Sequence, residues 1–326
     1  MLLSIHPAAH GEIIDHAGIF AQAKPERVLS SDAGEGPAWH PKHGLVFSGP
    51  NGITNLKPGT DPDLLLPNAG SNGLLFDRQG RLLVCQPRFR RFSRLNVETG
   101  MLEVLTDQFQ GKKYNQPNDV TFDSKGRLYF SDPKYGPRDG LEQLDANGRP
   151  VEGVYRVDPD GTVDRIIEHE VDRPNGLLVT PDDHYLFVAD NNNNQVGAPR
   201  ILWRFDLSAE GKIDSSSKKL IYNWRSGRGP DGMAVDHKGR LYVAGGRNQP
   251  NPPYETAGDY KGGIYVLSPT GKLLAFVPIP KDEVTNCTFA GDDLKTLYIT
   301  AGGTLWKIAT TTRGVIPALM KEPAGP

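Results

Sequence analysis

The sequence lacks the features that would mark a membrane protein or a nucleic-acid-binding protein. Its 326 residues have a formal net charge of −2 and no block of lysine and arginine suited to nucleic acid. No run of about 18 apolar residues occurs, so no membrane-spanning helix is expected. Met1–Ala9 lacks the basic stretch and apolar stretch of a signal peptide, which favours a cytoplasmic location.

Cysteine is also scarce. The two cysteines, Cys85 and Cys287, lie far apart in segments that resemble strands. We therefore expect two buried, reduced thiols and no disulfide or thiolate metal site. Helical periodicity is nearly absent as well, whereas 37 glycines and 27 prolines are spread along the chain as turn residues between short strands.

A repeated phrase organises the chain. It consists of a polar residue, a small residue, an apolar strand, a charged turn and a second apolar strand. The six copies are EGPAWHPKHGLVF from Glu35, NGLLFDRQGRLLV from Asn72, NDVTFDSKGRLYF from Asn118, NGLLVTPDDHYLFV from Asn175, DGMAVDHKGRLYV from Asp231 and NCTFAGDDLKTLYI from Asn286.

Each copy reads as a β-hairpin, and further strand signals follow most copies, giving four strands per unit. Four-stranded units repeated at this spacing are typical of propeller blades. We predict an all-β, six-bladed β-propeller that forms a single domain over residues 1–326. The segment Pro25–Ser30 is expected to complete the last blade and close the ring, which would remove a sheet edge.

The residues that open the six phrases are the candidate site, because the first strand of each blade lines the central channel. They comprise two carboxylates and four carboxamides, namely Glu35, Asn72, Asn118, Asn175, Asp231 and Asn286. Oxygen donors of this kind suit one hard or borderline divalent cation. We expect Ca²⁺, although Mg²⁺, Mn²⁺, Zn²⁺ and Fe²⁺ are compatible. Turn capping is the alternative explanation, since Asn and Asp commonly precede strands.

Two long connections, Ser131–Val151 and Ala244–Gly262, are predicted to return to the same face as the phrase openings. Long loops in a compact domain are usually functional. Lys134 and Tyr135 in the first connection are therefore candidates for contact with a substrate, as is Asn72 at the channel.

Four segments resemble the gluconolactonase and regucalcin family, also called the senescence marker protein or luciferin-regenerating enzyme-like family. They are EGPAWHP at Glu35, PNDV at Pro117, RPNGLLVTPDD at Arg173 and GPDGMAVDHKGRLYVA at Gly229. The resemblance extends from about Pro25 to Ile308. It implies a six-bladed propeller that holds one divalent ion through Glu35, Asn175 and Asp231, with Asn118 as a further ligand or a contact to substrate. A family arginine is replaced here by Gln116.

The resemblance also implies hydrolysis of a small lactone. A divalent ion would polarise the carbonyl, and Asp231 would be both a ligand and the general base. Asn118 and Gln116 would donate hydrogen bonds to the substrate. An organophosphate or aryl-ester hydrolase of the metallo-propeller type, a non-catalytic propeller that binds calcium or protein, and a metal-free propeller similar to strictosidine synthase remain alternatives. The sequence specifies neither the lactone nor the oligomeric state.

Overall fold

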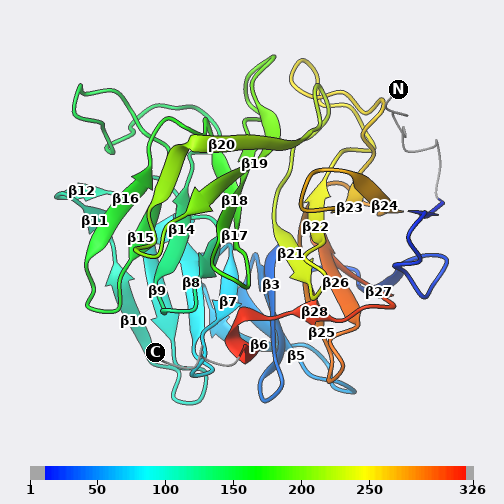
Figure 1. Cartoon of the computed structure of the whole chain (residues 1–326). Helices are drawn as coiled ribbons and strands as arrows, with labels where there is room; N and C mark the ends of the chain where they lie inside the picture. Colours follow the sequence, from blue (N-terminus) through cyan, green and yellow to red (C-terminus); the bar gives the residue numbers. More distant parts are fainter. Residues whose placement is uncertain (1–11, 321–326) are drawn as a thin grey trace.

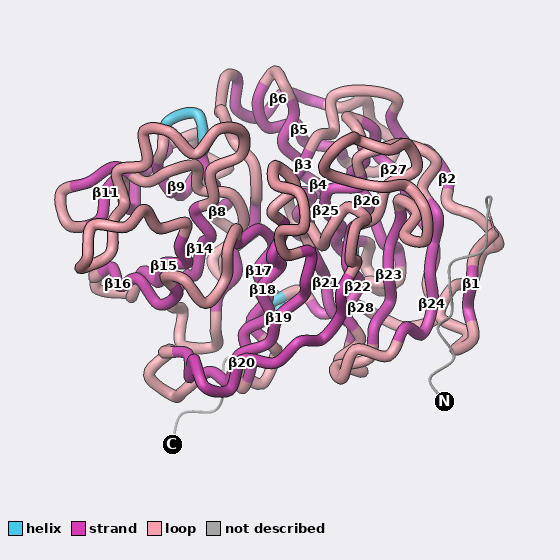
Figure 2. The backbone as a smooth tube through the Cα atoms, turned by 90° about the horizontal axis from the view of Figure 1, so that it is seen from above, coloured by secondary structure: helices cyan, strands magenta, loops and turns pink. Residues whose placement is uncertain are grey.

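A computed structural model describes residues 12–320, and the segment Met1–Ala9 discussed above lies outside them. Six antiparallel sheets follow one another along the chain and surround a common axis (Figures 1 and 2). Within the described residues the only helical segments are the 3₁₀ turns η1 (Pro87–Phe89) and η2 (Pro317–Leu319). The prediction of an all-β, six-bladed propeller is confirmed. No helix within residues 12–320 is long and apolar enough to cross a membrane.

The first three sheets each contain four strands, ordered from the axis outward. The first contains β3 (Glu35–His40), β4 (Gly44–Gly49), β5 (Gly52–Leu56) and β6 (Asp63–Pro67). The second contains β7 (Leu74–Phe76), β8 (Leu82–Gln86), β9 (Arg91–Leu95) and β10 (Leu102–Thr106), followed by the small hairpin β11 (Gln108–Phe109) and β12 (Lys112–Lys113). The third contains β13 (Val120–Phe122), β14 (Leu128–Asp132), β15 (Gly153–Val157) and β16 (Val163–Ile167).

The last three sheets continue the ring, and the two ends of the chain add strands to them. The fourth contains β17 (Pro174–Val179), β18 (Tyr185–Asn191), β19 (Arg200–Leu207) and β20 (Ile213–Asn223). The fifth contains β21 (Met233–Asp236), β22 (Leu241–Gly245), β23 (Gly263–Leu267) and β24 (Leu273–Pro278), with β28 (Gly314–Val315) beside β21 and β1 (Ile14–Asp15) beside β24. The sixth contains β25 (Val284–Ala290), β26 (Thr296–Ala301), β27 (Thr304–Ala309) and β2 (Glu26–Leu29).

The ring closes at the sixth sheet. Strand β2 pairs antiparallel with β27, opposing Glu26 to Lys307 and Arg27 to Trp306. The innermost strands also contact their neighbours all the way round, including β25 against β3. Residues from the two ends of the chain therefore share one sheet, and the axis is surrounded on all sides.

Charged turns at one face stabilise the inner hairpins. In the second sheet Asp77 Oδ1 accepts hydrogen bonds from the backbone of Gln79 and Arg81, each at 2.9 Å, and Asp77 Oδ2 pairs with Arg81 Nε at 2.8 Å. The turns that begin at Asp123 and Asp236 repeat this arrangement. The repeated D-x-x-G-R sequence therefore encodes a capped turn.

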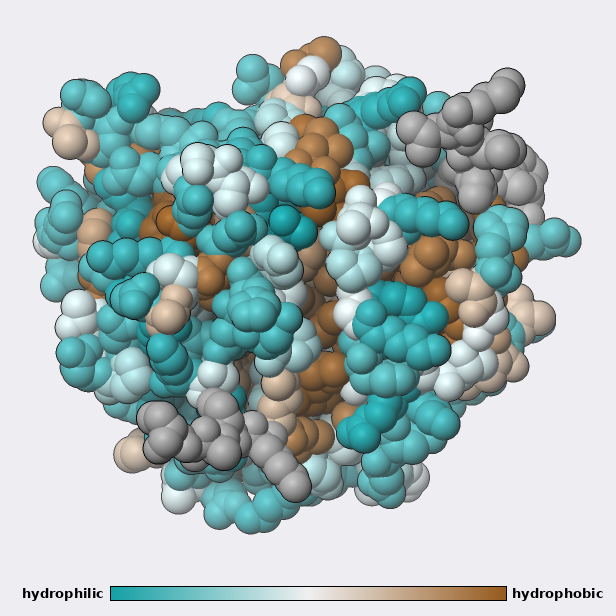
Figure 3. Space-filling view, viewed as in Figure 1, coloured by the Kyte–Doolittle hydropathy of each residue, from teal (hydrophilic) through white to brown (hydrophobic). Residues whose placement is uncertain are grey.

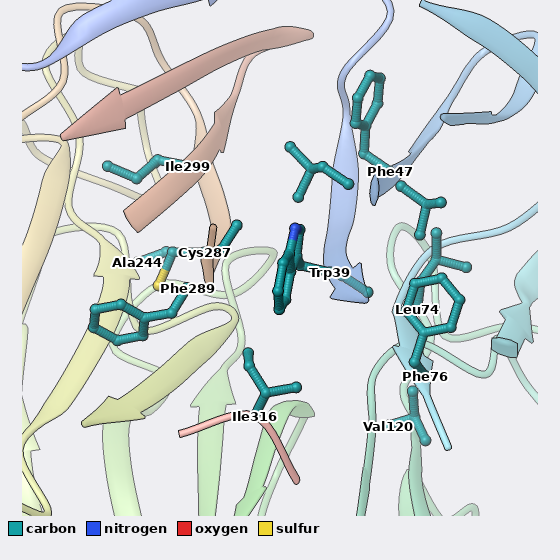
Figure 4. Close-up of a cluster of buried hydrophobic side chains, with 14 of the residues drawn as sticks. Trp39, Phe47, Leu74, Phe76, Val120, Ala244, Cys287, Phe289, Ile299 and Ile316 are labelled. Carbon is teal, nitrogen blue, oxygen red and sulfur yellow. The ribbon is translucent and has the colours of Figure 1, made fainter. Parts of the chain in front are cut away.

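Apolar side chains pack between neighbouring sheets. Figure 4 shows Trp39 of β3 between residues of the second sheet, such as Leu74 and Phe76, and residues of the sixth, such as Phe289. Ile316, in the C-terminal segment, reaches toward this cluster, and β28 covers the edge of β21 at the same end of the channel. Cys85 and Cys287 are buried free thiols, as expected. Figure 3 shows that this face of the molecule is mostly hydrophilic, with apolar residues exposed near the middle of the view.

Candidate functional site

The residues that open the six repeats lie at the same end of the six innermost strands, opposite the end covered by β28. Glu35, Asn175 and Asn286 lie within the first residues of β3, β17 and β25. The other three precede β7, β13 and β21 by two residues each, and they are Asn72, Asn118 and Asp231. The predicted convergence at one end of the channel therefore matches the arrangement of the strands.

Small residues beside these openings allow neighbouring strands to approach closely. A Cβ atom at Gly36 would lie 2.3 Å from the carbonyl oxygen of Asn72, and the φ of +55° at this glycine disfavours other residues. A Cβ atom at Gly176 would lie 2.1 Å from the carbonyl oxygen of Asp231. Four of the six opening residues are followed by a glycine, and at Gly36 and Gly176 this allows the next blade to approach closely, so that the polar side chains lie near one another.

Glu35 and Asp231 are two carboxylates within electrostatic reach of each other. Burial raises the pKa of Glu35 to about 7, although a hydrogen bond from Asn286 Nδ2 at 2.9 Å opposes this rise. Burial likewise raises the pKa of Asp231 to about 8; Arg228 opposes this rise, and the charge of Glu35 adds to it. Asp231 is only 5% exposed. Ionising both carboxylates here calls for compensating positive charge.

Asp119 is a third carboxylate near the axis, buried like Asp231, and it was missed by the sequence analysis. Its Oδ2 accepts the backbone N–H of Leu177 at 2.9 Å, which links the third blade to the fourth. Burial raises the pKa of Asp119 to about 7, and the charge of Asp231 acts in the same direction. The available signal was its position, because Asp119 follows Asn118 where four other copies have glycine.

The axial carboxamides differ in how many of their side-chain atoms form hydrogen bonds with the rest of the chain. Asn175, 3% exposed, donates from Nδ2 to the hydroxyl of Tyr135 at 2.5 Å, and its Oδ1 makes no hydrogen bond within residues 12–320. The side chain of Asn118 is buried and likewise makes none to the described chain. Asn72 Oδ1 is buried with no hydrogen-bond partner among the described residues. Several amide oxygens at this end of the channel are therefore free to bind something else.

Tyr135 extends from the β14–β15 connection to the axial residues. Its backbone N–H donates to Gln116 Oε1 at 2.9 Å, and the guanidinium of Arg173 lies 5.4 Å from the centre of its ring. Burial raises the pKa of the Tyr135 phenol, with the charge of Asp231 contributing, so the hydroxyl remains a hydrogen-bond donor at neutral pH. The structure thus brings Tyr135 and Gln116 together at the site.

Lys134 reaches the site only through its backbone. Its N–H donates to Glu152 Oε2 at 2.7 Å, and no hydrogen bond or ion pair within residues 12–320 involves its ammonium group. Glu152 also pairs with Arg138 and, at 3.0 Å, with Arg173 Nε. This ion-pair network fixes the base of the connection that carries Tyr135.

Arg228 is the second site residue missed by the sequence analysis. It lies in the β20–β21 connection, is 4% exposed, and donates from Nη2 to Asp231 Oδ2 at 2.8 Å. The sequence GRGPDG places it three residues before Asp231, but the repeat pattern carries no information about the direction of a side chain in a connection. A fixed positive charge therefore contacts the predicted catalytic carboxylate.

The axial residues fit a divalent cation through oxygen donors of two kinds. No three His, Cys, Asp or Glu side chains within residues 12–320 are grouped so as to hold a metal ion. A cation at this position would therefore use amide oxygens as well as carboxylates. The neighbouring carboxylates of half-buried Glu35 and buried Asp231, together with the free Oδ1 of Asn175, would supply donors of both kinds.

Comparison with known proteins agrees with this geometry. The model of the family described as "SMP-30/Gluconolactonase/LRE-like region" matches residues 33–303, which include all six axial positions. The chain belongs to this family. Membership in the SMP-30/gluconolactonase family confirms the resemblance inferred from the sequence motifs.

Individual members of the family show similarity over most of the chain. A gluconolactonase from Zymomonas mobilis is 31% identical, with 89% of this chain and 82% of that protein covered. A pentonolactonase from Haloferax volcanii is 26% identical over 83% of this chain and 81% of that protein. The solved structure of a gluconolactonase from Xanthomonas campestris superposes with a TM-score of 0.72 at 27% identity, covering 92% of this chain and 94% of the other.

Proposed function

We propose that this member of the SMP-30/gluconolactonase family hydrolyses small sugar lactones with the help of one divalent cation, which we expect to be Ca²⁺. The observation that carries the proposal is the pair of neighbouring carboxylates, half-buried Glu35 and buried Asp231, among free amide oxygens at one end of the channel. The names of the relatives from Zymomonas mobilis and Haloferax volcanii support a lactone as the substrate class.

Glu35, Asn118, Asn175 and Asp231 would hold the cation. When bound, a divalent cation supplies Lewis-acid chemistry that polarises a carbonyl group. Positive charge there also favours the ionised forms of Glu35 and Asp231, whose pKa values are raised in the protein alone. Asn286 holds Glu35 in place through its 2.9 Å hydrogen bond.

Asp231 is the proposed general base. It takes a proton from a water molecule while the water oxygen bonds to the carbonyl carbon of the lactone. The bond between that carbon and the ring oxygen then breaks, and the ring oxygen accepts a proton, which yields an open hydroxy acid. Asn118 would donate a hydrogen bond to the substrate. Gln116 acts chiefly by positioning Tyr135, because its Oε1 already accepts from the Tyr135 backbone.

The experiment strips the protein with a chelator and assays gluconolactone, a pentonolactone and one organophosphate, adding back each divalent metal separately. We expect lactone turnover to require a metal. Glu35→Gln and Asn175→Ala should weaken metal binding in calorimetry, whereas Glu103→Gln, on the exposed outer strand β10, should not. Equal metal affinity in all three variants would contradict the ligand assignment. Cleavage of the organophosphate alone would favour the second type of hydrolase, and metal binding without turnover would favour a binding protein.

A further inference from the structure

Arg228 has hydrogen-bonding capacity that the protein itself does not use. A guanidinium carries five N–H donors, and buried donors are almost always paired. Within residues 12–320, however, the only hydrogen bond of the Arg228 side chain is the one from Nη2 to Asp231 Oδ2. Nε and Nη1 are both buried without a hydrogen-bond partner. The unused donors thus lie next to the proposed general base.

Acidic neighbours hold this guanidinium in place without occupying those donors. Nη1 lies 3.4 Å from Glu283 Oε1 and 3.8 Å from Glu255 Oε1, distances that balance charge although neither contact is a hydrogen bond. Arg247 shares both glutamates and takes the closer contact with Glu283. Arg228 is therefore anchored by electrostatic attraction, while its N–H groups remain available.

Two other polar side chains near this face already have hydrogen-bond partners. Arg173 donates from Nε and Nη2 to Glu152 and from Nη1 to Asn194 Oδ1 at 2.6 Å. Gln116 accepts from Tyr135. Arg228 differs from both because it combines direct contact with Asp231, burial, and two N–H positions without an acceptor.

We propose that Arg228 binds the acyl oxygens of the substrate, first the carbonyl oxygen of the lactone and then the carboxylate of the ring-opened hydroxy acid. This inference rests on the proposed function. A carbonyl carbon close enough to receive water activated by Asp231 must also lie close to Arg228, since the two side chains are in contact. Hydrolysis places growing negative charge on the acyl oxygens, and guanidinium donors bind carboxylates strongly.

The proposal assigns Arg228 a role in recognising an anion, which a purely structural role would not require. The test compares two ligands with the same carbon chain, gluconate, which has a carboxylate, and glucitol, which is neutral. Calorimetry at saturating Ca²⁺ would measure both ligands with the wild type, Arg228→Gln and Arg228→Lys. The matched control is Arg247→Gln, which alters the same glutamate cluster without contacting Asp231.

We expect Arg228→Gln to weaken gluconate binding by about 10- to 100-fold, the range for a lost hydrogen bond to a charged group, and to leave glucitol binding unchanged. Arg228→Lys keeps the charge but lacks the planar donor geometry, so its affinity for gluconate should lie between those of the wild type and Arg228→Gln. Arg247→Gln should stay within about twofold of the wild type, the scatter expected of a residue that does not contact the ligand. Turnover of gluconolactone by Arg228→Gln should fall about 100-fold in kcat.

Unchanged gluconate affinity in Arg228→Gln would overturn the proposal. An equal loss of gluconate and glucitol binding would also overturn it, because that result indicates general distortion of the site. If Arg228→Gln does not fold, the same comparison of the two ligands in Arg228→Lys decides. The wild type could bind gluconate through Arg228 and yet hydrolyse no lactone. That result would support the carboxylate site and overturn the proposed function.

Discussion

The side-chain amide of Asn286 donates a hydrogen bond to Glu35 Oε1 across 2.9 Å, joining residues 251 positions apart in the chain. The same contact connects the inner strand of the sixth blade with that of the first. One polar contact therefore links the first and sixth blades at the axis and orients a proposed metal ligand. Asn286 Oδ1 is itself fixed, because it accepts the backbone N–H of Cys287 at 2.8 Å.

Loss of this contact should weaken the proposed cation site. We expect Asn286→Ala to reduce Ca²⁺ affinity about 10- to 100-fold, the usual range for a residue that orients a metal ligand. Calorimetric titration of the chelator-treated protein would measure the change. Asn147→Ala, in an exposed turn, is the matched control. An Asn286→Ala affinity equal to that of the control would show that Glu35 keeps its orientation without Asn286.

The close approach of the fourth and fifth blades gives a prediction about stability. A Cβ atom at Gly176 would lie 2.1 Å from the carbonyl oxygen of Asp231, and backbone cannot yield as a flexible side chain can. Gly176→Ala should therefore lower the free energy of unfolding by roughly 1–3 kcal/mol, as overpacking does. Gly258→Ala is the control, since no atom lies within 4 Å of a Cβ there. Urea denaturation would measure both, and equal midpoints would refute the close packing.

The fold was predictable from the sequence because it is repetitive. Each phrase supplies a hairpin with a D-x-x-G-R turn or a variant of it, and hydrophobic alternation marks the remaining strands. The axial positions could be inferred from the repeat as well. Each repeated phrase opens at the start of the innermost strand of its blade, and this strand lines the channel. What the repeat determines, namely Glu35, Asn175 and Asp231 at one end of the axis, could be inferred without coordinates.

Residues outside the repeat could not be found in this way. Asp119 occupies a position where four of the other five copies have glycine, so a comparison of the copies gives no sign of its contact with Leu177. Arg228 lies in a connection, where the direction of a side chain depends on tertiary contacts such as its pair with Asp231. Lys134 and Tyr135 were both predicted to contact substrate from their place in a long loop, and the loop alone could not show that the Tyr135 hydroxyl contacts Asn175.

Asp132, at the end of β14, should make stability depend on pH. Burial raises its pKa to about 8, although backbone N–H groups of Asn115 and Gln116 oppose the rise. The folded chain thus holds a proton that the unfolded chain loses near pH 4. This stabilisation is complete below pH 4 and is lost as the pH rises through 8. The Tm of Asp132→Asn minus that of the wild type should therefore be larger at pH 9 than at pH 5. An equal difference in Tm at both pH values would exclude a role for Asp132 in the pH dependence of stability.

The turnover of the Asp231→Asn variant distinguishes an enzyme from a binding protein. The substitution keeps the size of the side chain and an oxygen donor but removes the base and one negative charge. We expect lactone turnover at saturating Ca²⁺ to fall about 10²- to 10⁴-fold, the usual cost of losing a positioned general base. Circular dichroism should show an unchanged fold, since the backbone N–H of Asp231 still donates to the carbonyl of Ala244. Turnover near the wild-type level would place the base elsewhere, and Glu35 or Asp119, the other axial carboxylates, would then be tested by the same substitution to the amide.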